Sequence, residues 1–257
     1  MPQHLALEFC KRTDPRYKAI RDRHYVPNKG AIGQQVHFIV LRDTETLGII
    51  SAGSCTQNVA SRDRFFGVTR ANRTKFMRSI VNNSVFRLEV NERYLATQVL
   101  ALWRKVVPLV WFDLYHAEVV GFETFVVETS TRVGALYRAD NWEFVGRTAG
   151  TKKSRKGLHA EPTRTKTESK LIFARKYDFS QTGWHEGDPG MEWVSSWRGR
   201  TPEEKRRGKE LSAHRKTQVM GKVYFLHRLR LGLEGVHRVP AADWPKLVAS
   251  GRLDVRG

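Results

Sequence analysis

The stretch that decides the fold is residues 85–127, which read VFRLEVNERYLATQVLALWRKVVPLVWFDLYHAEVVGFETFVV. The first six residues place Val85, Arg87 and Glu89 on one face and Phe86, Leu88 and Val90 on the other, so one face is wholly apolar, as in a half-buried strand. Residues 95–106 carry apolar side chains at helical spacing, and 119–127 form a nearly continuous apolar run that suits a strand buried on both faces. A strand, a helix and a strand in this order form a crossover unit, so the two strands are predicted to be parallel. Pro108 lacks a backbone N–H and restricts the residue before it, so we expect the helix to end at Val107 and a second short helix to start at the proline.

The segments on either side of this unit extend the same architecture. Residues 14–25 predict a short helix, because an aspartate able to cap it precedes a proline in its first turn. Residues 36–41 and 47–54 are two β-rich runs separated by a polar turn, which predicts an antiparallel hairpin. A short helix over 132–139 and a strand over 142–146 complete the order. The sequence therefore predicts an α/β fold with a mixed central sheet flanked by helices.

The charge of the chain points to a polyanionic partner. There are 45 Lys and Arg residues against 26 Asp and Glu, a formal net charge of +19. Each phosphate that a basic side chain neutralises releases counterions, so nucleic acid is the first candidate. The alternative is a surface that only keeps the protein soluble, although acidic residues serve solubility better. Residues 1–146 hold 20 basic and 14 acidic side chains, whereas 147–257 hold 25 and 12, so most of the excess lies in the second part.

The uneven charge suggests how the chain is divided. We expect a catalytic core over residues 1–150, a basic DNA-contacting insertion over 151–218, and a last sheet strand with the C-terminal tail over 219–257. The alternative is that the residues after 178 form a separate small unit.

Composition excludes several classes of protein. A hydrophobic content of 40% and an aromatic content of 11% support a packed core and exclude wholesale disorder. No run of about 18 apolar residues exists, so no membrane span is expected, and the N-terminus does not resemble a secretory signal. Cys10 and Cys55 are too few for a disulfide framework or a cysteine-rich zinc site. We expect a protein of the bacterial cytoplasm that does not contact membranes.

Three groups of residues are candidates for chemistry. Glu123 lies inside an apolar strand, where a carboxylate is costly unless it is paired or used, and burial would raise its pKa toward the range of a general base. The structural alternative is an ion pair with a buried arginine such as Arg87. Tyr137 has a phenol that could protonate a leaving group. The structural alternative is an aromatic side chain that only packs on the sheet. His24 and Tyr25 end the first helix and form a candidate substrate-side pair, although a lone histidine is more often structural.

The run GALYRADNWEFVG, residues 134–146, resembles the last core helix and strand of the GNAT acyl-CoA transferase superfamily. The strand–helix unit before it resembles the GNAT unit that holds the pyrophosphate of CoA. This resemblance implies a GNAT-like mixed sheet and acetyl-CoA or a related acyl-CoA donor. The usual Gln/Arg-x-x-Gly-x-Gly/Ala loop falls on residues 91–97, which read NERYLAT and lack both glycines. The donor contacts that it implies are Leu88, Val90, Arg93, Thr97 and Asn141.

A narrower resemblance covers residues 14–150. The strings RHY, NNSVFRLEV, LATQVLALW, ETFV, GALYRADNWEFVG and T-x-G, in this order, are similar to the phage Mom DNA-modification family and to DruA-type proteins of bacterial anti-phage systems. The Mom resemblance implies transfer of a carbamoylmethyl (acetamido) group to N6 of adenine in double-stranded DNA, which protects the DNA from restriction. The active-site residues implied are His24, Tyr25, Glu123 and Tyr137, with iron as a further candidate held by the histidine and the glutamate. The DruA resemblance implies instead a defence component that binds DNA without modifying it.

The proposed reaction assigns a role to each group. Adenine N6 lies inside the duplex, so the base must be flipped out at a cost of a few kcal/mol. Tyr25 is predicted to stack on or orient the base, Glu123 to accept the amine proton and Tyr137 to donate to the departing group. The basic residues predicted to contact phosphates are Arg62, Arg64, Arg70, Arg73, Lys152, Lys153, Arg155 and Lys156. Two further alternatives are a GNAT enzyme for a small amine or a protein, and an architectural DNA binder without catalysis.

Overall fold

The computed structural model describes residues 4–26, 33–154, 163–166, 168–177, 201–228 and 234–250. Its strands are β1 (Leu5–Cys10), β2 (Gln35–Arg42), β3 (Glu45–Ser54), β4 (Ile80–Leu88), β5 (Gly121–Val127), β6 (Glu143–Arg147), β7 (Thr151–Ser154), β8 (Thr163–Lys166), β9 (Lys170–Lys176), β10 (Lys222–Arg228) and β11 (Glu234–Pro240). Its helices are α1 (Pro15–Arg21), α2 (Ala60–Phe66), α3 (Arg73–Ser79), α4 (Leu95–Tyr115), α5 (Ala135–Ala139), α6 (Pro202–Val219) and α7 (Trp244–Ala249).

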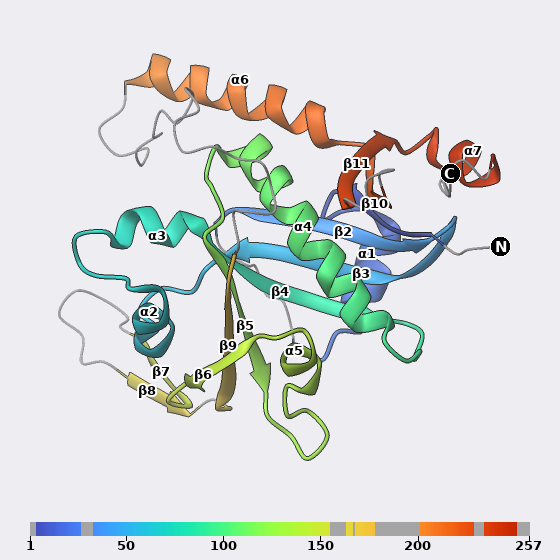
Figure 1. Ribbon diagram of the computed structural model, residues 1–257. Helices are drawn as coiled ribbons and strands as arrows, with labels where there is room; N and C mark the ends of the chain where they lie inside the picture. Colours follow the sequence, from blue (N-terminus) through green and yellow to red (C-terminus); the bar gives the residue numbers. More distant parts are fainter. Residues whose placement is uncertain are drawn as a thin grey trace.

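One large mixed sheet organises the described residues, in the strand order β11-β10-β1-β2-β3-β4-β5-β9-β6 (Figure 1). The predicted hairpin is confirmed as β2 and β3, which pair antiparallel. The predicted crossover is also confirmed, because β4 and β5 pair in parallel with α4 between them in the chain. The observed fold is therefore the predicted α/β class, a mixed sheet flanked by helices.

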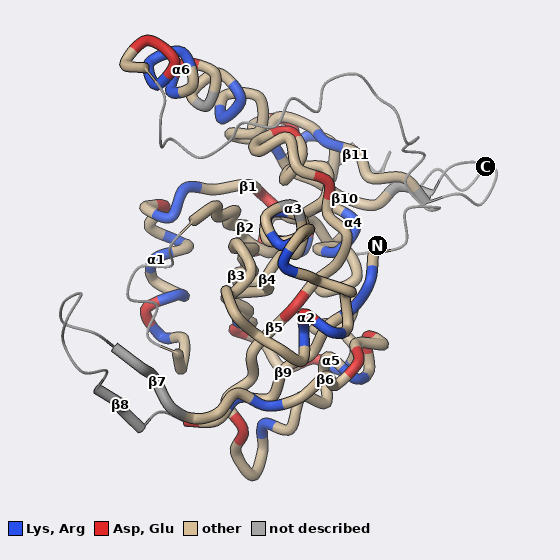
Figure 2. Tube along the Cα trace, turned by 90° about the vertical axis from the view of Figure 1, so that its left-hand side faces the viewer, with Lys and Arg blue, Asp and Glu red and all other residues tan. Residues whose placement is uncertain are grey.

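Two layers of helices cover the sheet. On one face α4 and α5 pack on a single large apolar cluster, which includes Trp103, Trp111 and Phe122. The other face carries two separate clusters, one under α1 and α7 and one under α2 and α3. Figure 2 shows the sheet from the side, with α1 to the left of the strands and α4 to the right, and α1 stands apart from α2 and α3. Polar side chains of the sheet lie between the two clusters, and they include His37, Ser51 and Glu123.

The expected end of the crossover helix at Val107 is wrong. α4 continues unbroken from Leu95 to Tyr115 with Pro108 inside it. The proline removes one helical hydrogen bond, but Val106, Val107, Val110 and Trp111 around it are all buried. Packing of both turns against the same sheet therefore outweighs the lost bond. α4 is also long and apolar enough to cross a membrane by length and composition, and this apolar character is used in the core.

Strands from beyond residue 150 belong to the same sheet as those from before it. β9 lies between β5 and β6 and pairs antiparallel with both, although it comes from the region expected to be an insertion. The last expected strand is present as β10, but it pairs with β1 and with β11 at the opposite end of the sheet. The described C-terminal strands thus extend the sheet beyond the N-terminal strand.

Candidate active site at the divergence of two parallel strands

The sheet opens where β4 and β5 part. The two strands pair only from Ile80–Gly121 to Asn82–Glu123. Beyond that point β4 stays with β3, and β5 stays with β9 (Figure 1). An irregularity in the β3–β4 register, next to Ser51, bends β4 at the same level. The C-terminal halves of two parallel strands are thereby separated, which is the edge where α/β proteins commonly bind ligands.

Tyr137 fills the apex of this opening from the α5 side. Its hydroxyl donates to Asn83 Oδ1 at 2.8 Å and accepts a hydrogen bond from the Thr124 hydroxyl at 3.3 Å. Tyr137 is almost fully buried, and burial raises the pKa of its phenol far above the usual value. Gly134 begins the helix at φ 76°, and a Cβ there would meet the Phe173 ring at 2.2 Å. A glycine is therefore required for α5 to bring the phenol this close to the sheet.

His24 and Tyr25 contact both diverging strands from outside the apex. Backbone hydrogen bonds influence the pKa of each ring, from Phe86 of β4 for His24 and from Val127 of β5 for Tyr25. The two rings lie 4.6 Å apart, and the Arg132 guanidinium lies 4.1 Å from the Tyr25 ring centre. Tyr25 is 43% exposed, and its phenol is close enough to raise the pKa of Tyr137. The structure therefore brings three of the four predicted catalytic residues to one opening.

Burial sets the protonation of this group near neutral pH. Burial lowers the pKa of His24 below its usual value, so its ring is neutral at pH 7. Burial raises the pKa of Tyr25 and of Tyr137, so both phenols keep their protons. A neutral imidazole accepts a proton, and a protonated phenol donates one. The opening thus holds a proton acceptor, the His24 ring, and two proton donors, the phenols of Tyr25 and Tyr137.

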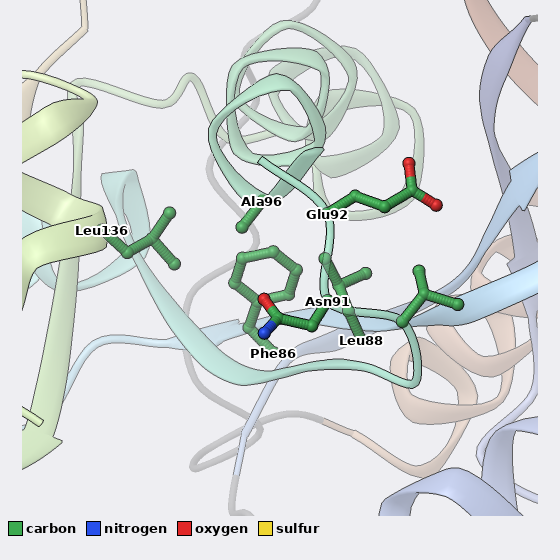
Figure 3. Close-up of a pocket in the computed structure, with 7 residues that line it drawn as sticks. Phe86, Leu88, Asn91, Glu92, Ala96 and Leu136 are labelled. Atoms are coloured by element: carbon green, nitrogen blue, oxygen red, sulfur yellow. The ribbon is translucent and has the colours of Figure 1, made fainter. Parts of the chain in front are cut away.

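A pocket of about 250 Å³ lies beside the opening, between the end of β4, the start of α4 and α5 (Figure 3). Its lining is mostly apolar and consists of Phe86, Leu88, Val90, Asn91, Glu92, Ala96 and Leu136. Two predicted donor contacts, Leu88 and Val90, belong to this lining. Arg93 is exposed beside the Tyr94 ring, Thr97 lies in the first turn of α4, and Asn141 occupies a turn after α5 at φ 59°. The roles of these three residues stay predictions.

Glu123 is held away from this group by an ion cluster. It is fully buried, its Oε1 accepts the Thr56 backbone N–H at 2.7 Å, and its other oxygen accepts a guanidinium N–H of Arg62. Arg62 also donates to Asp63 at 2.8 Å, and Arg73 donates to the other oxygen of Asp63 at 2.9 Å. Burial raises the pKa of Glu123 to about 7, against the opposing effect of Arg62. Adjacent residues of a strand face opposite sides, so Glu123 points away from Tyr137, whose neighbour on β5 is Thr124.

The prediction that Arg62 contacts DNA phosphates is wrong, because its side chain is completely buried against Glu123. The structural alternative for Glu123, a pair with a buried arginine, is thus realised with Arg62 and not with Arg87. The spacing in the sequence could have indicated that Arg62 is buried, because Arg62 and Phe66 lie four residues apart and so share one face of a helix. In the structure both are buried on that face of α2.

The other predicted phosphate contacts are placed as follows. Arg64 and Arg70 are exposed, and Arg73 is half-buried beside Asp63. Lys152 and Lys153 lie on β7, in the small sheet that it forms with β8. Arg155 and Lys156 lie outside the described residues, as do the tryptophans at 184, 193 and 197.

Sequence reasoning missed a second buried polar group on the face of α1. The Tyr17 hydroxyl lies 2.7 Å from Ser51 Oγ, and His37 Nδ1 lies 3.0 Å from the same oxygen. Burial lowers the pKa of His37 to about 4. Asn83 was also missed, although the NNS run just before the alternating strand is an unusual set of polar residues for a core strand. Such residues mark sites where a polar partner must arrive from elsewhere in the chain.

Iron finds no support in the donor set. Among the residues that the structure describes, no group of three or more His, Cys, Asp or Glu side chains is placed to hold a metal ion. The two proposed ligands also have other partners, since Glu123 pairs with Arg62 and His24 Nδ1 accepts the Val26 backbone N–H at 3.2 Å.

A family model described as Druantia protein DruA matches residues 7–160, more than half of the chain. The chain belongs to the DruA family. The match to DruA runs from β1 through β7 and includes the opening between β4 and β5, whereas β9, α6, β10 and β11 lie beyond it. No curated protein matches.

Solved structures similar to this DruA-family chain include acetyltransferases. NAA60 of Arabidopsis thaliana in complex with acetyl-CoA is 14% identical, with a TM-score of 0.40, over 67% of this chain and 98% of that one. The ribosomal L7/L12 α-N-protein acetyltransferase RimL is 10% identical, with a TM-score of 0.38, over 67% and 93%. An acetyltransferase from Sphaerobacter thermophilus is 12% identical, with a TM-score of 0.35, over 69% and 96%.

Proposed function

We propose that this DruA-family protein transfers an acyl-derived group from an acyl-CoA donor to N6 of adenine in double-stranded DNA. The observation that carries the proposal is the opening between β4 and β5. Tyr137 closes its apex from the α5 side, the pocket beside α4 flanks it, and His24 and Tyr25 reach it from outside. An acyl-CoA in the pocket and an adenine beside His24 and Tyr25 would meet at the Tyr137 hydroxyl.

The residues on the donor side suit an acyl-CoA in part. The apolar lining of the pocket matches an extended thiol-bearing arm, and α4 begins at its mouth without a side-chain cap, so first-turn N–H groups are available to phosphate. Arg93 adds a positive charge at that helix end. The Glu92 carboxylate, which would repel phosphate, pairs with Arg42 at 2.8 Å and points away from Phe86 and Leu136 (Figure 3). When bound, the donor supplies an activated acyl group.

The acceptor side offers aromatic surface and a proton acceptor. Tyr25 is exposed enough for a flipped base to stack on its ring, and Arg132 beside it favours contact with the DNA backbone. The amine proton must go to a base. Neutral His24 is better placed to accept it than Glu123, because His24 lies at the opening, whereas Glu123 points to the opposite face of β5 and is held there by Arg62 and Thr56. Tyr137, protonated because burial raises its pKa, donates to the departing thiolate.

Mass analysis of nucleosides tests the proposal directly. Plasmid DNA from cells that express the wild-type protein is expected to contain a modified adenine, and its mass identifies the transferred group. Tyr137→Phe keeps the ring but removes the donor, so modification should be lost while the protein stays folded. Glu123→Gln is expected to retain modification if its stability allows expression. Unmodified adenine with folded wild-type protein would refute the transferase.

The second candidate function is a DruA-type defence component that binds DNA without changing it. The burial of Tyr137 and Glu123 favours it, because Glu123 is fully buried and Tyr137 is almost fully buried in this structure. This alternative predicts DNA binding with a steep dependence on salt and unmodified adenine in every sample. Binding and mass analysis of the same preparation separate the two functions.

A further inference from the structure

α6 is a polar helix that the candidate site does not use. It spans Pro202–Val219, begins with a capping box between Thr201 and Glu204, and contacts α4. Val219, its last residue, is buried in the α4-side cluster. The side chains described along the rest of the helix are mostly exposed, and basic residues recur along it (Figure 2). A helix that is polar on nearly all sides needs a reason to stand on the surface.

The exposed basic residues of α6 include a straight row of lysines. Successive residues of a helix turn by about 100°, so Lys205, Lys209 and Lys216 lie within about 40° of each other around the axis. At about 1.5 Å per residue the row is about 16 Å long. We call these three residues the lysine ridge. The half-buried Arg215 and the buried Val219 lie on the neighbouring side of the helix, so the ridge flanks the contact with α4 and faces outward.

The acidic residues of α6 do little to neutralise the ridge. Glu203 and Glu204 lie in the first turn, where Glu204 is used in the cap. Glu210 lies 3.9 Å from Arg206, on a different side of the helix from the ridge. Lys205, Lys209 and Lys216 are all exposed. The ridge therefore presents a row of positive charges to a partner.

The chemistry of the ridge fits a phosphate backbone better than a protein surface. Protein interfaces have apolar and aromatic centres from which lysine is depleted. The exposed large apolar residue of α6, Leu211, lies well round the helix from the ridge. Phosphate contacts need only positive charges spaced along a line, and they carry no sequence information.

The position of α6 separates this surface from the acceptor side of the site. α6 contacts α4 and buries Val219 in the α4-side cluster, whereas Tyr17 and Ile20 of α1, the helix that leads to His24, belong to a cluster on the other face. In Figure 1, α6 runs above the top of the sheet. We infer that α6 is a second DNA-docking element, which lies along the phosphate backbone of a duplex through Lys205, Lys209 and Lys216. The inference deepens the proposed function, because it takes the DNA of that function as the partner.

The test is the salt dependence of binding to a labelled DNA duplex, measured by fluorescence anisotropy with the full chain. The triple variant K205Q/K209Q/K216Q is expected to lose about one unit of salt slope for each lysine, and its affinity at low salt should fall at least tenfold. K205R/K209R/K216R keeps the charge and should bind like the wild type. K11Q/K18Q/K246Q removes three exposed lysines from the α1 and α7 regions and is the matched control. Circular dichroism checks that each variant folds.

The outcomes are distinct from those of the proposed function. An unchanged slope for the α6 glutamine variant would overturn the inference and would leave an acidic protein as the partner of the ridge. Equal losses for that variant and its control would also overturn it, because net charge alone would then explain binding. A protein that binds through α6 but leaves adenine unmodified supports this inference and contradicts the transferase.

Discussion

The contributions of two buried groups, Glu123 and His37, to the stability of the protein should change with pH in opposite directions and nearly cancel each other between pH 5 and pH 7. The pKa of Glu123 is raised from 4.5 to about 7, so the folded state holds this proton more tightly than the unfolded state. Its contribution to stability is present at low pH and is lost as pH rises, by about 2 kcal/mol across this window. The pKa of His37 is lowered from 6.5 to about 4, so here the unfolded state binds the proton more tightly. Its contribution increases by about 2 kcal/mol over the same window, and the two changes offset each other.

Single substitutions should reveal each component. Urea unfolding followed by tryptophan fluorescence gives the free energy of unfolding at several pH values. Glu123→Gln should become more stable relative to wild type as pH rises from 5 to 7, because it has no buried carboxyl whose stabilising proton is lost. The stabilising effect of rising pH on His37 remains in this variant. The pKa of His24 is also lowered, so His24 adds to the effect of His37. His37→Gln keeps a polar group near Ser51. Its free energy of unfolding relative to wild type should fall as pH rises from 5 to 7, the opposite of the result for Glu123→Gln. The exposed Glu143→Gln is the control and should run parallel to wild type. Parallel profiles for Glu123→Gln and wild type would refute the assignment of a raised pKa to the buried carboxyl.

Two further predictions concern single side chains. Arg62→Met should lower the free energy of unfolding by about 3–5 kcal/mol, because it leaves a buried carboxylate without its partner, yet it should not change the DNA affinity of the folded protein measured by anisotropy. A clear loss of affinity in the folded variant would restore Arg62 as a phosphate contact. Gly134→Ala and Gly67→Ala both place a side chain at positive φ, which costs about 1–2 kcal/mol, but only at position 134 does the new Cβ strike the Phe173 ring. The first should therefore cost about 1–3 kcal/mol more than the second in denaturant unfolding, and equal costs would contradict the close approach of α5.

Local pattern was enough to predict the centre of the fold. The β2–β3 hairpin and the parallel β4–β5 pair both follow from short apolar runs and the handedness of crossover connections. The insertion of β9 between β5 and β6 was not predictable in this way, because antiparallel pairing with distant strands depends on the whole sheet and not on the run itself. The predicted end of α4 at Val107 was wrong for a related reason. A rule about one residue, Pro108, takes no account of the burial of the helical turns on both sides of it.

The sequence indicated which residues lie near the candidate site better than it indicated which of them contact each other. His24, Tyr25 and Tyr137 do converge on the β4–β5 opening. Glu123 does not join them, because a strand alternates its faces and residue 124, not residue 123, points toward α5. The partner of Glu123 could not be identified from charge pattern alone, since a buried arginine and an exposed one look the same in a basic segment.

The type of basic residue separates the charges that hold the fold from those available to a polyanion. In the described part of the protein, arginines make the ion pairs closest to the core, such as Arg62–Glu123 and Arg104–Asp140, where both guanidinium contacts are 2.7 Å. A planar guanidinium can satisfy both oxygens of a carboxylate, whereas a lysine ammonium is a compact, strongly hydrated charge that stays at the surface. The net charge of +19 therefore overstates what a phosphate backbone can reach around the described sheet, and the lysine ridge of α6 is one of the parts that it can reach. Substitution of core arginines should change stability and not salt slope, and substitution of the ridge should do the opposite.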